Sequence, residues 1–312
     1  MLNCSSHLWR LGCCLAIVSA FAAPAGPTVS RSALANASAG QSVRMGAYDP
    51  YGTFANDPKI GIEHIFIPWQ DVNLPSLSMA DQYARDRART LLITVEPWTW
   101  SYRNKRETPE ELFAGIMAGS YDNLIRDLCQ KSASLRSQVT LRWGHEMDLG
   151  NDRYPWSAWT PAEFVKAYRH FVDTCRVAAR GLQFMWSPRG EPGLQEYYPG
   201  SDYVDSIGLT MFGFQKYEIQ LYGKALSLAE RLGRSYELVA DYGKDVYISE
   251  FGCHGDQGYM RRCLDEARTA AATFPGVKGV IYFNEVETYQ WPGVEGVPDW
   301  RVMSKLFAEL PQ

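Results

Sequence analysis

Leu141-Arg-Trp-Gly-His-Glu-Met-Asp148 follows an apolar run, 137–141, and presents four ionisable side chains within seven residues. The apolar run has the length and composition of a buried strand, so the charged group falls at the strand's carboxyl end. A buried carboxylate is costly unless it is protonated, paired or hydrogen-bonded, and Glu146 stands beside His145 and near Arg142. The segment therefore predicts a site with tuned protonation states at the end of a strand.

A second strand-end glutamate lies in Val246-Tyr-Ile-Ser-Glu-Phe-Gly252, where Glu250 again ends an apolar run. Two carboxyl groups at such positions are what glycoside hydrolysis needs, one to protonate the leaving oxygen and one to attack the sugar. Retention of configuration requires the two groups to lie about 5 to 5.5 Å apart. Each also has a structural alternative, in which Glu146 pairs with Arg142 and Glu250 caps a neighbouring helix.

The chain contains eight short runs rich in apolar, β-branched or aromatic residues, each separated from the next by a loop or a helical pattern. Several runs are continuous rather than alternating, which is typical of parallel strands covered on both faces. Eight such strands predict an α/β fold, the (β/α)8 TIM barrel. The runs are residues 42–47, 62–68, 90–95, 137–141, 182–186, 204–210, 246–249 and 277–283.

Two capping sequences, Thr108-Pro-Glu-Glu111 and Thr160-Pro-Ala-Glu163, predict helix starts. The second helix is expected to run to Arg180 and to stop at Gly181. Further helices are expected in residues 215–243, 257–273 and 300–310. Because no internal repeat, charge block or Pro-rich linker interrupts the pattern, we expect residues 42–312 to form a single catalytic domain.

The amino terminus reads as a secretory signal peptide over residues 1–22, with Arg10 before the apolar run 11–18 and small residues at Ala20-Phe-Ala22. The apolar run is too short to span a membrane, and no later segment reaches that length. We therefore expect a flexible leader over 23–41 and a secreted or periplasmic protein without a membrane anchor. Cys13, which follows Leu-Gly, leaves lipidation as an alternative.

The composition excludes some partners and favours others. The 312 residues carry 31 Lys and Arg against 35 Asp and Glu, without a basic run, which makes nucleic acid an unsuitable partner. Aromatic residues make up 13% of the chain and include 10 Trp, whose flat faces can stack on sugar rings. We expect a monomer that binds a polysaccharide or oligosaccharide.

Four cysteines remain after signal removal: Cys129, Cys175, Cys253 and Cys263. An even count in an exported protein permits two disulfides, and we favour Cys129–Cys175 and Cys253–Cys263 among the three possible pairings. Free buried thiols are the alternative. No metal is expected, because the pair His145-Glu146 has no second His at helical spacing.

Residues just past the carboxyl ends of barrel strands converge on one face, where active sites lie. The strand assignment therefore predicts which side chains form the site. They are Tyr48, Asp49, Trp69, Gln70, Asp71, Glu96, Trp98, Trp100, Arg142, His145, Glu146, Trp186, Arg189, Phe212, Glu250, Asn284 and Glu285.

Several of these strand ends resemble glycoside hydrolase family 26, whose best-known members are β-mannanases. The similar segments are His145-Glu-Met147 with Asn151-Asp-Arg-Tyr-Pro-Trp156, Glu196 to Leu209, Phe184-Met-Trp-Ser-Pro188, Thr94-Val-Glu-Pro-Trp98 and Ile248-Ser-Glu-Phe-Gly252. The resemblance covers five strand ends over most of the mature chain. It implies a retaining (β/α)8-barrel glycosidase without a cofactor.

The resemblance also implies individual roles. Glu146 corresponds to the general acid/base and Glu250 to the nucleophile, with His145 hydrogen-bonding in the same cluster. Substrate-binding positions are expected at His145, Arg142, Glu96, Trp98, Trp156, Trp186, Phe212, Asn284 and Trp291. For Trp291, plain packing is the more common role of such a residue.

Some positions depart from the family pattern. Asp148 stands where the family usually has Asn, and Arg153 replaces a frequent aromatic residue. Phe212 or Phe214 occupies the region of a Tyr that hydrogen-bonds the nucleophile, a role that Tyr217 can take over. These differences weaken the assignment of substrate most.

The sequence thus predicts a secreted endo-glycosidase that hydrolyses a neutral or mildly charged β-linked polysaccharide with retention. β-Mannan is the first expectation, followed by β-1,4/β-1,3-glucan or xylan, and then an exopolysaccharide. The rival hypothesis is a non-catalytic carbohydrate-binding barrel that kept both glutamates for hydrogen bonding.

Overall fold

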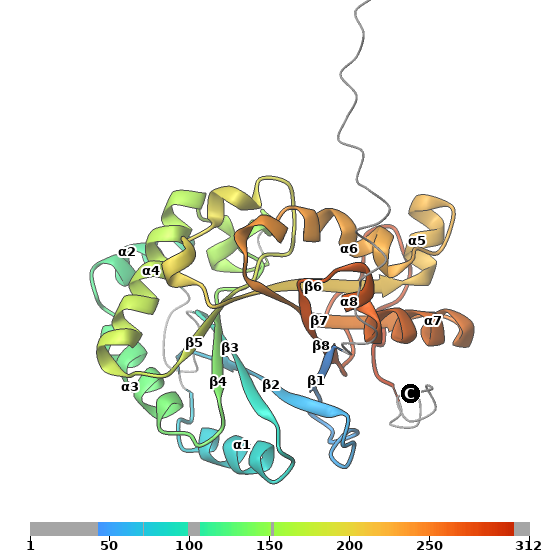
Figure 1. Ribbon diagram of the computed structural model, residues 1–312. Coiled ribbons are helices and arrows are strands. Elements are labelled where there is room, and N and C mark those ends of the chain that lie inside the picture. The colour runs from blue at the N-terminus through green and yellow to red at the C-terminus, as the bar shows by residue number, and fades with distance from the viewer. Residues whose placement is uncertain (1–42, 71, 99–106, 151–152, 303–312) are drawn as a thin grey trace, which may run out of the picture. The chain divides into compact units, whose positions relative to one another are not determined.

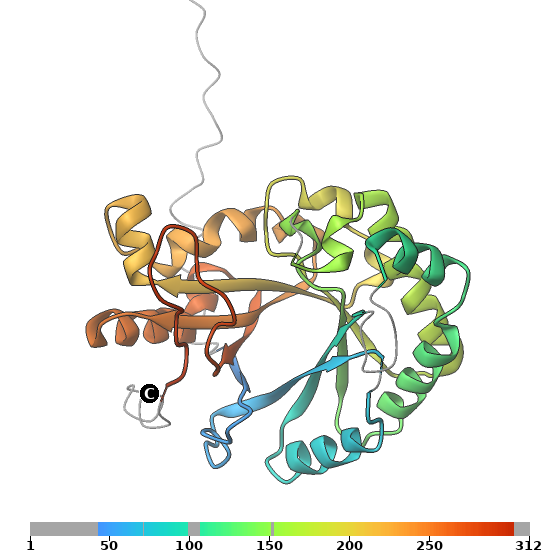
Figure 2. The same ribbon diagram turned by 180° about the vertical axis from the view of Figure 1, so that it is seen from behind.

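The computed structural model describes residues 43–70, 72–98, 107–150 and 153–302. Eight parallel strands form a closed barrel in which each strand pairs with its neighbours in sequence order (Figures 1 and 2). The (β/α)8 prediction is therefore confirmed. The strands are β1 Arg44–Tyr48, β2 Ile60–Pro68, β3 Thr90–Glu96, β4 Val139–Trp143, β5 Gln183–Trp186, β6 Ser206–Phe214, β7 Asp245–His254 and β8 Val277–Phe283.

The barrel closes between β1 and β8, where Arg44 pairs with Gly279 and Tyr48 with Phe283. The predicted runs locate all eight strands, although β6 and β7 continue four and five residues beyond residues 210 and 249, the expected ends. Phe212 and Glu250 therefore lie within the sheet, whereas the sequence predicted that both residues follow the strands.

Helices lie outside the ring of strands (Figure 1). They are α1 Ser76–Arg85, α2 Pro109–Met117, α3 Asp122–Ala133, α4 Pro161–Ala178, α5 Gln215–Tyr222, α6 Leu228–Glu237, α7 Gln257–Arg268 and α8 Ala270–Thr273. They are not distributed one to a strand, because the connections 49–59 and 187–205 contain turns and 3-10 segments but no α-helix. Residues 189–192 of the second connection line the cleft that contains the site.

Both predicted capping boxes are present, with Thr108 accepting from the N–H of Glu111 and Thr160 from that of Glu163. The helix that begins at Pro161 ends at Ala178, two residues before the expected end.

The helix expected over 215–243 is wrong as a single element. Gly223 ends α5 in a left-handed conformation with φ 73°, and Ser227 starts α6 with its own capping box. Glycine is the residue that adopts this conformation without steric cost, so Gly223 breaks the pattern. Most of the helix expected over 300–310 lies outside the described residues.

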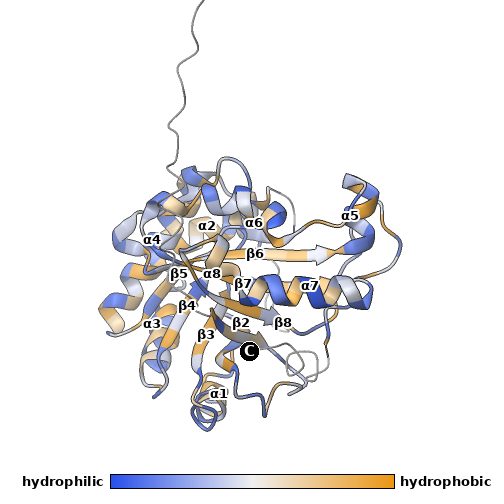
Figure 3. Cartoon of the chain, turned by 45° about the vertical axis from the view of Figure 1, so that its right-hand side comes forward, coloured by the Kyte–Doolittle hydropathy of each residue, from blue (hydrophilic) through white to orange (hydrophobic). Residues whose placement is uncertain are grey.

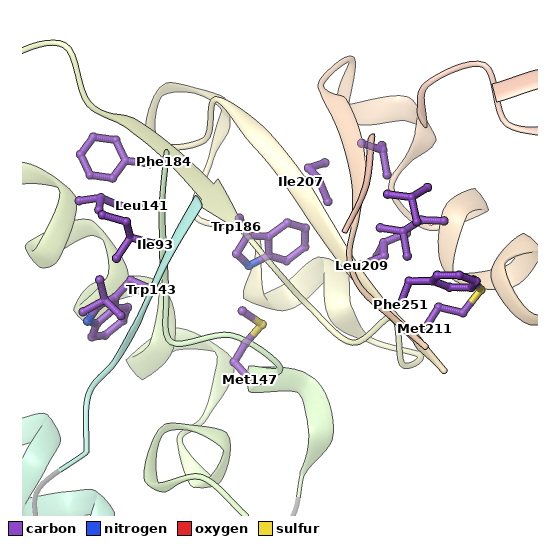
Figure 4. Packing of buried hydrophobic residues seen from close by; sticks show 14 of the residues in the cluster. Ile93, Leu141, Trp143, Met147, Phe184, Trp186, Ile207, Leu209, Met211 and Phe251 are labelled. Carbon is purple, nitrogen blue, oxygen red and sulfur yellow. The ribbon is translucent and has the colours of Figure 1, made fainter. Parts of the chain in front are cut away.

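The main core lies between the sheet and the helices, and Figure 4 shows part of it. Side chains alternate along a strand, so Leu141 and Trp143 of β4 face the helices while Arg142 faces the barrel interior. A smaller cluster, Ile62, Leu92, Met185 and Ile281, fills the interior. Hydrophobic residues are concentrated on the strands, and the helices mix both kinds (Figure 3).

Two disulfides confirm the favoured pairing. Cys129–Cys175 joins α3 to α4, and Cys253–Cys263 joins the end of β7 to α7. The second bond lies three residues beyond Glu250, and it therefore ties the end of that strand to the outer layer.

The expected signal peptide, 1–22, and leader, 23–41, lie outside the described residues. Within the part of the chain that the structure describes, no helix has the length and apolar character needed to cross a bilayer.

Candidate active site

Glu146 is presented by an unusual backbone turn at the end of β4. Gly144 and Glu146 both have positive φ, 56° and 53°, and the N–H of Glu146 donates to the carbonyl of Ser187 at 2.8 Å. A residue other than glycine in this region costs about 1–2 kcal/mol, and such strain is concentrated at functional sites. The residue is 4% exposed. The fold therefore maintains a buried carboxyl group at this point despite the strain.

Glu250 owes its orientation to an irregularity in β7. Leu209 of β6 pairs with Ile248, but the next residue, Thr210, pairs with Glu250, so Ser249 is an extra residue. Such a bulge redirects the following side chain. The Ser249 hydroxyl lies 3.2 Å from that of Ser187 inside the barrel, while Glu250 reaches Arg142. Both consecutive side chains thus point inward.

Arg142 is the group in contact with Glu250. It is fully buried, and its Nη1 lies 2.7 Å from Oε1 of Glu250. Its Nε donates to the Ser187 hydroxyl at 2.8 Å, and Nη1 donates to that of Thr94 at 3.2 Å. The alternative in which Arg142 pairs with Glu146 is therefore wrong, as is a helix-capping role for Glu250.

The negative charge of Glu146 affects the protonation of Glu250. Burial raises the pKa of Glu250 to about 7, with the negative charge of Glu146 adding to the rise and the cation of Arg142 opposing it. The ionised form of Glu250, which a nucleophile needs, is therefore gained as the pH rises through about 7.

His145 lies in this cluster, but its observed partner is Tyr154. The Nε2 atom lies 3.3 Å from the Tyr154 hydroxyl, and the Trp156 indole donates to the His145 carbonyl at 2.6 Å. Burial, followed by the charge of Arg142, holds the pKa of His145 well below its usual range. The imidazole is therefore neutral and packs as an aromatic ring beside Glu146.

Trp156 and Trp186 do not present free faces to a ligand. Both are 0% exposed; Trp156 stacks on Tyr154 at 4.7 Å, and Trp186 lies in the core shown in Figure 4. Trp186 is buried because side chains alternate along a strand. Met185 faces the barrel interior, so Trp186, the next residue, faces the helices. Their expected role as substrate-binding residues does not fit this burial.

Glu96 is the last residue of β3, the strand next to β4, and Trp98 follows it. Burial raises the pKa of Glu96, and the negative charge of Glu146 contributes to that rise, so the two carboxyl groups are near each other. Trp98 is half-buried, with its ring 5.7 Å from that of Tyr154 and 5.3 Å from that of Trp156. Both residues remain candidates for substrate contact.

A cleft of about 620 Å³ brings Glu146 and Glu250 together with Phe212 and Trp291. Among the lining residues that sequence analysis did not select as site residues are Glu218, Arg231, Arg234, Glu287 and Tyr289. They come from the connections after β6 and β8. The sequence of these connections has no motif or periodicity from which their position in the cleft could be predicted. Tyr217 packs edge-on against Trp291 at 5.0 Å.

Asn284, by contrast, is a structural residue. Its amide donates to Asp49 at 2.8 Å and accepts from the N–H of Val302 at 2.9 Å, and the residue is 1% exposed. It joins the end of β8 to the loop after β1. The expected substrate contact is therefore not supported by its surroundings.

Asp148 explains one departure from the family pattern. Its carboxylate accepts three backbone N–H groups, from Arg189 at 2.7 Å, Gly190 at 2.9 Å and Glu191 at 2.8 Å. An acceptor with two oxygens suits this task better than an amide, which has one. Asp148 thus fixes the loop after β5 against the turn that carries Glu146.

In the described residues, no cluster of three or more His, Cys, Asp or Glu side chains is arranged to hold a metal ion. His64, which lies on β2, bonds through Nε2 to the Thr94 hydroxyl at 2.8 Å. The site is therefore built from carboxyl, guanidinium and aromatic groups.

No family model matches the chain. The structure is similar to that of GH26C from Muricauda sp., at 16% identity and TM-score 0.58, covering 76% of this chain and 75% of that one. It is also similar to the GH26 β-mannanase BoMan26A of Bacteroides ovatus, at 15% identity and TM-score 0.51, covering 72% and 71%. The Bacillus subtilis mannanase BCman matches at 15% identity and TM-score 0.52, covering 78% and 80%.

One curated relative, a β-1,3-xylanase of Alcaligenes sp., is 27% identical over 107 residues. That match covers 32% of this chain, and the chain spans 22% of the relative's length. At identities of this size, the structural matches establish a shared fold. The chain thus has the closed eight-stranded barrel of solved GH26 enzymes, as its sequence resemblance predicted.

Proposed function

We propose that the protein is a glycoside hydrolase of the family 26 type that cleaves a β-linked polysaccharide with retention. The observation that carries this proposal is the placement of Glu146 and Glu250. Glu146 lies just beyond β4 and Glu250 lies within β7; both are buried, and both line one cleft. The GH26 structures share the barrel, which supports the assignment.

In the first step, the ionised carboxylate of Glu250 attacks the anomeric carbon and the glycosidic C–O bond breaks. Glu146 gives its proton to the departing oxygen, so the leaving sugar departs as a neutral alcohol. Arg142 favours the ionised form of Glu250 through its 2.7 Å contact. The product of this step is a glycosyl ester on Glu250.

In the second step, Glu146, now a carboxylate, removes a proton from water. The water oxygen attacks the anomeric carbon, the ester bond breaks, and the Glu250 carboxylate is restored. Two displacements at the same carbon give net retention. No metal or cofactor takes part in this scheme.

For the substrate, β-mannan is the first candidate because two similar structures are mannanases. Xylan follows, because the curated relative is named a β-1,3-xylanase, and β-glucans and exopolysaccharides complete the panel. We propose endo action by a secreted or periplasmic monomer. The two disulfides fit an oxidising compartment.

Reducing-sugar release from this panel tests the proposal. The wild type should release sugar from at least one polysaccharide, while Glu250→Ala should release none. Glu237→Ala removes an exposed carboxylate from α6 that does not line the cleft, and it serves as the control that should retain turnover. Glu146→Ala should slow natural substrates far more than aryl glycosides, because only a poor leaving group needs the proton.

Binding without release of sugar by the wild type would favour the rival hypothesis, a non-catalytic carbohydrate-binding barrel. Equal losses on natural and aryl substrates in Glu146→Ala would remove the acid/base assignment.

A further inference from the structure

The cleft contains arginines in two different situations. Arg231 is paired with Glu218 at 2.6 Å, and their side chains are only 6% and 4% exposed, so the pair is part of the buried structure. Arg153 and Arg189 instead keep 30% and 39% of their side chains exposed. They meet Glu287 and Glu191 at the longer distances of 3.7 and 3.3 Å. The second kind is accessible to a ligand.

Both accessible arginines lie near Glu146. Burial opposes the charge of Arg189, but the carboxylate of Glu146, the largest favourable contribution, raises the pKa of Arg189. Glu146 also contributes to a raised pKa at Arg153, where burial again opposes the charge and Tyr154 and Tyr289 contribute more. Together with the lining of the cleft, this places two cations beside the proposed acid/base.

These two side chains are also held in place before any ligand binds. Arg189 follows β5 on a loop whose N–H groups are fixed by Asp148. The guanidinium of Arg153 lies 4.2 Å from the ring centre of Tyr289 and 5.2 Å from that of Tyr154. A side chain that is already oriented loses less entropy on binding a ligand.

The chemistry of the guanidinium identifies the ligand group. Its planar fork matches a carboxylate in two parallel hydrogen bonds, whereas neutral sugar hydroxyls gain little from a positive charge. The ion pair of Arg189 with Glu191 is partly exposed on both sides and therefore weak, so a ligand carboxylate can replace Glu191. Arg153 receives the same carboxylate on the exposed 30% of its side chain. Because Glu146 protonates the leaving oxygen, this carboxylate belongs to the sugar on the leaving-group side.

We propose that Arg153 and Arg189 bind the carboxylate of a uronic acid on the leaving-group side, so that the substrate is an acidic β-linked polysaccharide. The inference rests on the proposed glycosidase function and narrows it, since the neutral mannans, xylans and glucans become poorer substrates than their uronic acid-bearing counterparts.

The test compares each acidic polymer with its own neutral form. Glucuronoxylan and glucuronomannan are assayed before and after chemical reduction of their carboxyl groups, with kcat/KM measured for the wild type, Arg153→Gln, Arg189→Gln and the double variant. The wild type should prefer one native polymer over its reduced form by about tenfold or more, the smallest effect expected for hydrogen bonds to a charged group. In the double variant this ratio should fall to about one.

The ratio cancels any indirect effect of the substitutions on Glu146, because both polymers are cleaved by the same variant. Arg126→Gln, on α3 and absent from the lining of the cleft, is the control and should keep the wild-type ratio. Equal wild-type rates on native and reduced polymers would overturn the inference. So would a preference for the native form that survives in the double variant.

Failure of the glycosidase function is distinguishable from failure of this inference. If the wild type cleaves neither form, affinity electrophoresis in gels containing each polymer measures binding alone. Retardation by the native polymer that exceeds retardation by the reduced one, and that disappears in the double variant, would support carboxylate binding. Equal retardation in both gels would refute it.

Discussion

Replacing Arg142 by Met should destabilise the protein in a way that depends on pH. At pH 5, Glu250 holds its proton in both proteins, because burial raises its pKa to about 7. The variant then loses mainly the hydrogen bonds of Arg142 to Ser187 and Thr94, at about 1 kcal/mol each. The expected loss in the free energy of unfolding at this pH is about 2 kcal/mol.

Above pH 7 the wild-type Glu250 ionises beside Arg142, whereas the variant keeps its proton because the opposing cation is gone. The difference in unfolding free energy should therefore grow by about 1.4 kcal/mol for each further pH unit. At pH 9 it should reach roughly 4–5 kcal/mol, in the range known for breaking a buried ion pair.

Denaturant unfolding at pH 5, 7 and 9 measures these differences, with Arg142→Met/Glu250→Gln as the matched control. That double variant has no ionisable group at residue 250, so its destabilisation relative to Glu250→Gln should not increase with pH. A loss in Arg142→Met that is the same at all three pH values would refute the reasoning. The activity of Arg142→Met at pH 7 should also fall, because the nucleophile remains protonated.

Three further predictions concern the same structure. Because the Glu250 nucleophile ionises only as the pH rises through about 7, kcat/KM should increase between pH 5 and pH 7, and a profile that falls over this interval would contradict this. In thermal unfolding, Glu146→Gly should be more stable than Glu146→Ala by roughly 0.5–1 kcal/mol, because glycine adopts the left-handed conformation of this residue without steric strain. Equal stability of the two variants would show that the turn is unstrained. Removing the Cys129–Cys175 disulfide, which closes a separation of 46 residues, should lower the free energy of unfolding by about 2–5 kcal/mol in denaturant titrations without dithiothreitol, and no change would contradict a structural role.

The barrel was predictable because each strand is a short apolar run, and because parallel strands bring their carboxyl ends to one face. The same logic identified Glu146, and the apolar run before Glu250 located that residue. The bulge at Ser249, which turns Glu250 inward, leaves no mark in a single sequence, since the extra residue is visible only in the pairing with β6.

The tryptophans show where strand-end reasoning was incomplete. Trp186 was selected for its position at the strand end alone. Met185, between Phe184 and Trp186, belongs to the cluster that fills the barrel interior, so Phe184 and Trp186 face the other way. A count of alternation would have assigned Trp186 to the helix-facing layer and Arg142 to the interior. Glu287 and Tyr289, from the segment after β8, follow no such period, and their place in the cleft depends on tertiary packing.

The most direct test of the central claim is to trap the covalent intermediate. An aryl 2-deoxy-2-fluoro-glycoside of the sugar that the protein hydrolyses should accumulate as an ester, and peptide mass spectrometry should locate the added mass on Glu250. An adduct on another residue, or the absence of any adduct together with release of the inverted anomer, would contradict the assignment of Glu250 as nucleophile and Glu146 as acid/base.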